Sequence, residues 1–306
     1  MTLKFKINLI MHHLKNDLLS IAVKPIGAEL AQINANKNDT EFLWNANDAI
    51  WANHAPNLFP VVGGLKDNTY HYEGKSYQLP KHGFIRYNED IKLVSESENE
   101  LIFKLSHNEA TLKVYPFHFN YYVIYKLNNT QLSITYKVEN CDTKPMYFSV
   151  GGHPAFKCSI YNDEFYSDYY LEFEQEEQSK SYTLDKPSGL ISQNTKAVFD
   201  TEKNINLKPD IFSDDALIFK DLQSKKVRLK SKNHGTILSV SFNDYNYLGL
   251  WAKPNANFVC IEPWLGLADV VGTNQELKTK EGIISLEANK SFSAQYTIEI
   301  DSRHLV

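Results

Sequence analysis

The chain has 306 residues, a hydrophobic fraction of 42%, a charged fraction of 23% and a formal net charge of −5. These values are typical of an ordinary globular protein and exclude a largely disordered chain. Because no long basic stretch accompanies the negative charge, neither nucleic acid nor a membrane is an expected partner.

The amino-terminal end and the cysteines bear on the cellular compartment. The apolar run Ile7–Met11 is too short for the core of a signal peptide, and no later stretch is long enough to span a bilayer. Cys141, Cys158 and Cys260 are an odd number at spacings that match no metal or redox motif, which favours a reducing compartment. We therefore expect a cytoplasmic protein, with residues 1–16 as a candidate disordered or non-native extension.

Taken in chain order, the predicted elements are strands separated by turns. Leu18 opens the first convincing strand, and the stretch Glu41–Ala52 could hold a turn or two of helix. Further along, apolar and polar residues alternate with a period of two, which indicates half-buried strands. These segments are Gln131–Val138, Tyr169–Glu174, Leu238–Phe242 and Phe292–Ile300. Gly, Pro and Asn predict turns between strands, at Glu73–Lys75, Asn128–Thr130, Lys186–Gly189 and Lys232–Gly235.

Many short strands without alternating helices are typical of an antiparallel sandwich or barrel. The acidic run Glu172–Glu177 is expected to be a solvated strand edge or loop. No linker rich in Pro, Gly or Ser and no internal repeat interrupts the chain, so we expect one domain over residues 1–306.

Three segments differ from the strands because each places an ionisable residue beside Gly or Pro. They contain His82, His153 and Glu262, and they span Leu79–Arg86, Gly151–Phe156 and Cys260–Gly266. Functional residues are often carried by loops of this kind, which a rigid scaffold positions. Taken alone, each of the three residues is weak evidence: a His beside Gly and Pro more often has a structural role, and Glu262 could cap backbone N–H groups.

In combination and order, these motifs resemble the aldose 1-epimerase (galactose mutarotase-like) superfamily. The likeness is greatest to its LacX-like and hexose-6-phosphate epimerase-like branch. It covers nearly the whole chain and includes two further blocks, Gly27–Leu30 and Asn57–Lys66. The resemblance implies an all-β, large antiparallel supersandwich that interconverts the α and β anomers of an aldohexose or hexose 6-phosphate. It implies a small-molecule sugar as partner, no cofactor and no metal, and it leaves the oligomeric state unknown.

The same resemblance implies roles for individual residues. His153 matches the catalytic acid and Glu262 the catalytic base, whereas His82, Arg86 and Asp215 match substrate-binding residues. Many relatives carry a substrate-contacting arginine where this chain has glycine at position 64. Its absence leaves Arg86, with Lys66 as a possible substitute, to supply positive charge.

Anomerisation suits this pair of residue types. The O1 hydroxyl loses a proton while the ring oxygen gains one, and a carboxylate and an imidazolium can serve as general base and general acid. Histidine has an ordinary pKa near ~6.5, so modest tuning keeps it able to donate. A nearby carboxylate, from Asp215 or Glu262, is expected to favour the charged imidazolium.

Other functions remain open at this point. A metal hydrolase lacks a His-x-His or His-Glu-x-x-His motif, and a serine hydrolase lacks its Gly-x-Ser-x-Gly elbow. A glycosidase could use Asp215 and Glu262 as its two carboxylates. A non-catalytic carbohydrate-binding or sugar-sensing protein could keep the same fold and site without turnover. Trp251 and Trp264 are candidate sugar-stacking platforms, although core packing is the expected role of most aromatic residues here.

Overall fold

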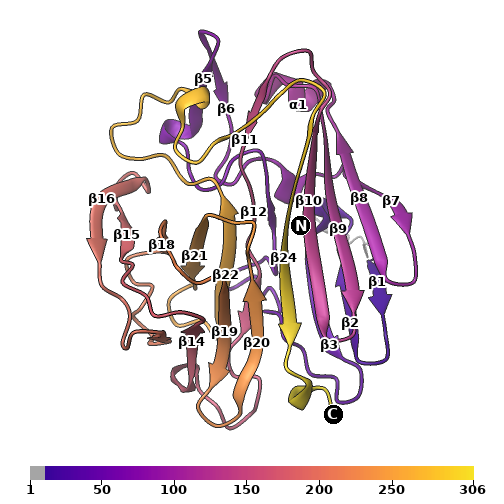
Figure 1. Cartoon of the computed structure of the whole chain (residues 1–306), viewed down its shortest axis with the longest axis vertical. Coiled ribbons are helices and arrows are strands. Elements are labelled where there is room, and N and C mark those ends of the chain that lie inside the picture. Colours follow the sequence, from indigo (N-terminus) through magenta and orange to yellow (C-terminus); the bar gives the residue numbers. More distant parts are fainter. Residues whose placement is uncertain (1–10) are drawn as a thin grey trace, which may run out of the picture.

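The computed structural model describes residues 11–306, whose regular structure is almost entirely β (Figure 1). Two large sheets carry the fold, and all their strand pairs are antiparallel. The first sheet contains, in spatial order, β17 (Asn204–Asn206), β14 (Tyr169–Phe173), β19 (Lys226–Ser231), β20 (Gly235–Ser241), β24 (Ser291–Ile300), β10 (Gln131–Asn140), β9 (Phe119–Asn128), β8 (Glu100–Ser106) and β7 (Lys92–Glu96). The second contains β16 (Ile191–Lys196), β15 (Ser181–Leu184), β18 (Leu217–Phe219), β21 (Tyr247–Trp251), β22 (Phe258–Leu265), β12 (Val150–Gly152) and β4 (Asn57–Leu58), with β13 (Ala155–Lys157) also paired to β22.

Smaller elements complete the described chain. The additional strands are β1 (His12–Lys15), β2 (Leu19–Val23) and β3 (Leu30–Ala35) in one sheet, and the pairs β5 (Thr69–Tyr72) with β6 (Lys75–Gln78) and β11 (Met146–Phe148) with β23 (Ile284–Leu286). One α-helix, α1 (Glu109–Val114), occurs within residues 11–306. Short 3-10 turns are η1 (Ile26–Ala28), η2 (Lys66–Asn68), η3 (Ile85–Tyr87), η4 (Tyr166–Asp168), η5 (Leu277–Thr279) and η6 (Ser302–His304). No helix within the described part of the chain is long and apolar enough to cross a membrane.

Most of the predicted elements are confirmed. The alternating segments became β10, β14, β20 and β24, and the four predicted turns lie between strands. The expected turn or two of helix within Glu41–Ala52 is wrong. This stretch holds isolated β-bridges at Glu41 and Leu43 and a single turn, in which the N–H groups of Ile50 and Trp51 donate to the carbonyl of Asn47. The helix α1 was not predicted. It begins at a capping box in which Asn108 and Thr111 exchange side-chain and backbone hydrogen bonds.

Two expectations about termini and edges need correction. Residues 12–15 are not part of a disordered extension, because they pair with β2 along the whole of β1. Residues 1–10 of that expected extension lie outside the described residues. In the acidic run, Glu177 is buried rather than solvated, and its carboxylate accepts hydrogen bonds from the backbone N–H groups of Gln223 and Ser224.

The two large sheets pack face to face around one apolar core. In β9 and β10 every second side chain is buried, as expected for strands with one face toward a core. The hydroxyl of Tyr136 on β10 donates to the side-chain oxygen of Asn57 on β4 at 2.8 Å, which joins the two sheets directly. A Cβ on Gly152 of β12 would lie 2.7 Å from the hydroxyl of Tyr296 on β24. Gly152 therefore faces the core, and its neighbours Gly151 and His153 face the opposite side of the second sheet.

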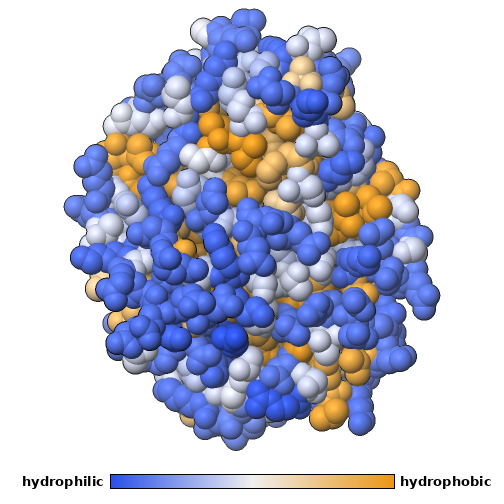
Figure 2. Space-filling model, in the orientation of Figure 1, coloured by the Kyte–Doolittle hydropathy of each residue, from blue (hydrophilic) through white to orange (hydrophobic). Residues whose placement is uncertain are grey.

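Polar side chains cover most of the face shown in Figure 2, where apolar residues form separate patches. Within residues 11–306, the large apolar side chains that are exposed are widely spaced in sequence: Ile50, Tyr87, Val94, Phe165, Val271 and Val306.

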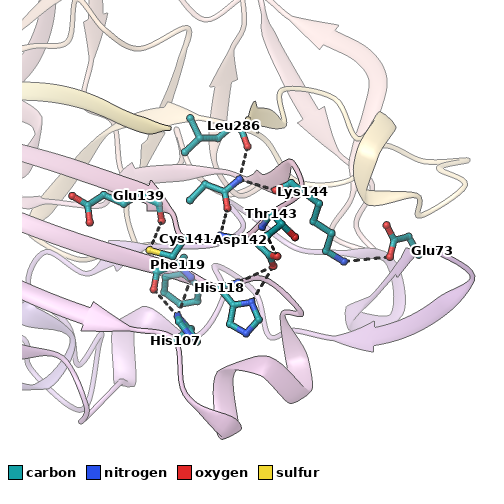
Figure 3. Close-up of polar contacts among 11 residues, drawn as sticks. Glu73, His107, His118, Phe119, Glu139, Cys141, Asp142, Thr143, Lys144 and Leu286 are labelled. Carbon is teal, nitrogen blue, oxygen red and sulfur yellow. Dashed lines mark hydrogen bonds and ion pairs between the residues drawn. The ribbon is translucent and has the colours of Figure 1, made fainter. Parts of the chain in front are cut away.

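A polar network fastens the turn after β10 to its neighbours (Figure 3). The side-chain amide of Asn140 donates to the carbonyls of Lys144 and Leu286 at 2.9 and 2.8 Å, while Lys144 pairs with Glu73 at 3.3 Å. These contacts tie β10 to β23 and to the turn of the β5–β6 hairpin. They stabilise one end of the sandwich.

Candidate functional site

A cavity of about 310 Å³ lies on the outer side of the second sheet and brings together most of the predicted site residues. His82, Arg86, His153, Asp215 and Glu262 all line it, although they come from segments far apart in sequence. The remaining lining residues are Ile50, Trp51, Gly63, Gly64, Lys81, Leu184, Gly189, Ala216, Ile218, Trp251, Lys253, Trp264 and Ala268.

Strand register places His153 next to Glu262. On β22, Trp264 pairs with Gly151 and Cys260 pairs with Ala155, both across the same antiparallel ladder. Continuing this register sets His153 opposite Glu262, and side chains of directly paired residues lie on the same face. The distance from His153 Nε2 to Glu262 Oε2 is 3.1 Å.

Small residues keep this face of the sheet open. Gly249 on β21 pairs with Glu262 from the other side and adds no side chain of its own beside the carboxyl group. A Cβ on Gly249 would lie 2.4 Å from the ring of Trp264, and one on Gly151 would lie 2.8 Å from the same ring. Trp264 thus packs flat against two glycines and forms one wall of the cavity.

His82 is held in an unusual backbone conformation. Its φ is 69°, in the left-handed region that non-glycine residues seldom adopt. The backbone N–H of His82 donates to the carbonyl of Gly63 at 2.9 Å, and the N–H of Gly63 donates to His82 Nδ1 at 3.1 Å. Because Nδ1 accepts, the ring carries its proton on Nε2 when neutral. This reciprocal pair orients the His82 ring edge toward His153, with ring centroids 5.5 Å apart.

Two tryptophans enclose the imidazole of His153. Trp51 stacks on the ring with centroids 5.2 Å apart, and Trp251 meets it edge-on at 5.8 Å. Among residues 11–306, these contacts leave His153 Nδ1 buried without a hydrogen-bond partner. The ring is therefore positioned by packing and by the carboxyl group of Glu262.

Charged groups line the wider part of the cavity. Arg86 donates to the hydroxyl of Tyr87 at 2.7 Å, while its buried Nε has no partner within the described chain. Asp215 has a φ of 78° and accepts from the N–H of Ala216 at 2.8 Å, and its side chain is exposed. Lys81 adds a second cation beside Arg86 in the lining.

Burial sets the protonation of the central pair. Burial, followed by the positive charges of Arg86 and Lys81, lowers the pKa of His153 from 6.5 to about 3. Burial raises the pKa of Glu262 well above its ordinary value, and Lys81 opposes this rise. Both directions favour an uncharged imidazole beside a protonated carboxyl group. The expectation that a neighbouring carboxylate keeps His153 charged is therefore wrong, because desolvation outweighs the attraction.

The pKa of His82 also lies well below its ordinary value, chiefly because the ring is buried and then because His153 is close. A neutral His82 with its proton on Nε2 can donate one hydrogen bond into the cavity. It cannot act as a second cation near neutral pH.

Lys66 does not join the other predicted residues. The cavity lining includes Gly64 and resumes at Lys81, and Lys66 is absent from it. Asp269 accepts from the backbone N–H of Lys66 at 2.9 Å, and Gln275 donates to its carbonyl at 2.9 Å. These bonds hold Lys66 in η2, where the chain turns toward the β5–β6 hairpin.

Among the aromatic and charged lining residues, three were not singled out from the sequence: Trp51, Lys81 and Lys253. Lys81 directly precedes His82 in the segment Leu79–Arg86, so the sequence could have indicated that Lys81 lies near the site. Trp51 lies in the stretch mistaken for helix. The space at Gly64 is open, since no atom of the described chain lies within 4 Å of the position of a Cβ there.

Donor atoms of a third residue lie close to the central pair. His153, Cys260 and Glu262 each offer one possible metal-ligand atom, and these three atoms lie within 4.8 Å of one another. All three residues are buried.

Comparisons with known proteins agree with this fold and identify the family. The aldose 1-epimerase family profile matches residues 11–285. The plasmid-encoded protein LacX of Lactococcus lactis subsp. lactis is 31% identical over 295 residues, which cover 94% of this chain and 98% of that protein. A galactose mutarotase related enzyme from Lactobacillus acidophilus superposes with a TM-score of 0.89 at 33% identity, covering 95% of this chain and 97% of that one.

A galactose mutarotase-like protein from Lactobacillus casei superposes with a TM-score of 0.88 at 27% identity, covering 95% of this chain and 100% of that one. These structures confirm the predicted galactose mutarotase-like architecture. Together with the extent of the family match, they show that this chain belongs to the aldose 1-epimerase family.

Proposed function

We propose that this protein is an aldose 1-epimerase that interconverts the anomers of an aldohexose, free or 6-phosphorylated, with His153 and Glu262 as the acid–base pair. The observation that carries the proposal is the 3.1 Å approach of His153 Nε2 to Glu262 Oε2 inside a cavity of about 310 Å³. A proton-handling pair open to a ligand pocket is what ring opening requires.

The uncharged pair can enter the reaction by one internal proton transfer. Moving the carboxyl proton of Glu262 to His153 Nε2 creates a carboxylate and an imidazolium at constant net charge. Glu262 then takes the proton of the sugar O1 hydroxyl while His153 gives its proton to the ring oxygen. The bond from C1 to the ring oxygen breaks and the C1–O1 double bond forms.

Ring opening returns the pair to its uncharged form. After rotation about the C1–C2 bond, the same steps run in reverse: Glu262 returns a proton to O1, and His153 accepts one from the C5 hydroxyl. The ring closes on the other face of the carbonyl. Burial, which favours the uncharged pair, therefore suits the open-chain intermediate, and the charged pair forms only for the moment of ring opening or after closure.

Neighbouring residues supply sugar orientation in this proposal. The partnerless Nε of Arg86 and the expected Nε2–H of His82 are donors to hydroxyl oxygens, and Asp215 is an acceptor. Trp251 offers an apolar edge for C–H groups. Lys81 with Arg86, rather than Lys66, forms the cation pair that would receive a 6-phosphate.

The test is catalysed anomeric exchange, measured by saturation-transfer NMR and by polarimetry with glucose, galactose and glucose 6-phosphate. We expect accelerated exchange for at least one sugar, with heat-inactivated protein as the blank. Sugar-induced thermal stabilisation without faster exchange would overturn the proposal and support a non-catalytic sugar-binding protein. A preference for glucose 6-phosphate that disappears in Lys81→Met would support the phosphate assignment.

A further inference from the structure

Three potential metal ligands converge at the proposed reaction site. The closest ligand atoms of His153, Cys260 and Glu262 lie within 4.8 Å of one another, and no other such group of three occurs within residues 11–306. Cys260 is fully buried, and the side chain of Glu262 is 1% exposed. Within the described residues, His153 Nδ1 has no hydrogen-bond partner, and Glu262 Oε2 has none apart from its 3.1 Å approach to His153 Nε2.

The arrangement follows from strand geometry. Cys260 precedes Glu262 by two residues on β22, so both side chains lie on the same face. Across the ladder, Cys260 pairs with Ala155, whose side chain is small. Cys260 does not itself line the cavity, and its fully buried thiol lies beside the two groups that do.

Nitrogen, sulfur and oxygen donors together match the ligand preferences of Zn²⁺. Zinc sites that use three protein ligands leave a fourth position for water or another molecule, and the cavity supplies that position here. With bond lengths of about 2.0 to 2.3 Å, tetrahedral donors lie roughly 3.5 Å apart. Donors that span up to 4.8 Å therefore need to move together by about 1 Å, which side-chain rotation can provide.

Charge balance also suits a divalent cation. A thiolate from Cys260 and a carboxylate from Glu262 neutralise Zn²⁺, while His153 contributes a neutral ring nitrogen. The thiol proton leaves for solvent when the metal binds. The resulting buried centre has no net charge, which avoids the large cost of an isolated buried ion.

We propose that His153, Cys260 and Glu262 form a Zn²⁺ site whose occupation inhibits this protein. The metal takes the lone pair of His153 and the carboxylate of Glu262, so neither can exchange protons with a sugar. The kinetic consequence rests on the proposed function, whereas metal binding itself does not. Zinc and sugar therefore compete for the same two side chains.

The experiment compares wild-type protein with Cys260→Ala in two independent measurements. Binding is followed with Co²⁺, because a cysteine ligand produces a near-ultraviolet thiolate-to-cobalt charge-transfer band, and by calorimetry with Zn²⁺. Inhibition is followed as the Zn²⁺ dependence of anomeric exchange. Cys158→Ala is the matched control, since Cys158 is also a free, fully buried cysteine but lies outside the group of three.

We expect Cys260→Ala to keep the basal exchange rate, to lose the cobalt band and to weaken zinc inhibition by more than about 100-fold. This magnitude exceeds the 10- to 100-fold loss typical of removing an outer partner of a metal ligand. Cys158→Ala should behave as the wild type. Cys260→Ser, which preserves side-chain size, serves if the alanine variant is unstable in thermal melts.

The outcomes separate this inference from the proposed function. A wild-type protein without the cobalt band, or equal zinc inhibition of Cys260→Ala and wild type, would overturn the metal site while leaving catalysis intact. A cobalt band that depends on Cys260 in a protein without exchange activity would support the site and reject the proposed function. Saturating sugar should raise the apparent zinc dissociation constant if both proposals hold.

Discussion

Replacing Glu262 with glutamine should reduce activity without weakening the fold. The Glu262 side chain is 1% exposed, and glutamine preserves its shape, so the packing against Trp264 and Gly249 is retained. The amide cannot accept the O1 proton. Since general acid–base catalysis is worth about 10²- to 10⁴-fold, the barrier should rise by about 3 to 5 kcal/mol.

Whereas its activity falls, the thermal stability of Glu262→Gln should equal or exceed that of the wild type. Burial raises the pKa of Glu262 above its ordinary value of 4.5, so the folded state keeps a proton that the unfolded state releases. Wild-type stability therefore falls as the pH rises from the unfolded pKa toward the folded one. Glutamine has no such dependence, and Glu262→Gln should melt at or above the wild-type temperature near neutral pH.

A cycle with His153→Asn tests whether the two groups act as a unit. Each group handles one proton of a coupled transfer, so the double variant should be little slower than the slower single one. Exchange rates from saturation-transfer NMR, with melting curves for all four proteins, provide the comparison. Near-normal exchange in both single variants would refute the acid–base assignment. Loss of exchange together with a lower melting temperature would point to structural damage instead.

Three further outcomes follow from charge and burial. Lys66→Ala should leave the KM for sugar unchanged, whereas Lys81→Met should alter it, because only Lys81 of the two lines the cavity. Steady-state kinetics of both variants measures this, and a larger KM change in Lys66→Ala than in Lys81→Met would contradict the geometry. The acid limb of the pH–rate profile should lie well below the ordinary histidine pKa. The His153–Glu262 pair is inactivated by a second proton, which it gains only when His153, with a pKa of about 3, becomes charged while Glu262 is protonated. An acid limb near ~6.5 would contradict this. Burial raises the pKa of Glu41 from 4.5 to about 7, so wild-type stability should fall as the pH rises through this interval. Glu41→Gln should therefore be more stable by up to about 3 kcal/mol near pH 8 and equal in stability below about pH 4, measured by denaturant unfolding.

The sequence contained enough local information for the strands and for the family. Alternation in Gln131–Val138 and Phe292–Ile300 predicted β10 and β24, because a period of two is a property of neighbouring residues. Local patterning failed at Glu41–Ala52, where Glu41 and Leu43 form bridges to residues outside this stretch and Trp51 stacks on His153. It also missed α1, a helix of only 6 residues that depends on its cap at Asn108.

The motifs around His82, His153 and Glu262 could be read from the chain, and five of the six predicted site residues line one cavity. What the chain alone could not decide was their spacing and protonation. Register between β12, β13 and β22 sets His153 against Glu262 with Cys260 close by, and register depends on pairing between distant segments.

Burial reversed the expected charge of His153 because desolvation is a property of everything packed around the ring. Tertiary structure also decided that Lys81, and not the predicted Lys66, lines the cavity. Both are lysines within the recognised blocks, and only the path of the backbone through η2 determines which ammonium group can reach the cavity.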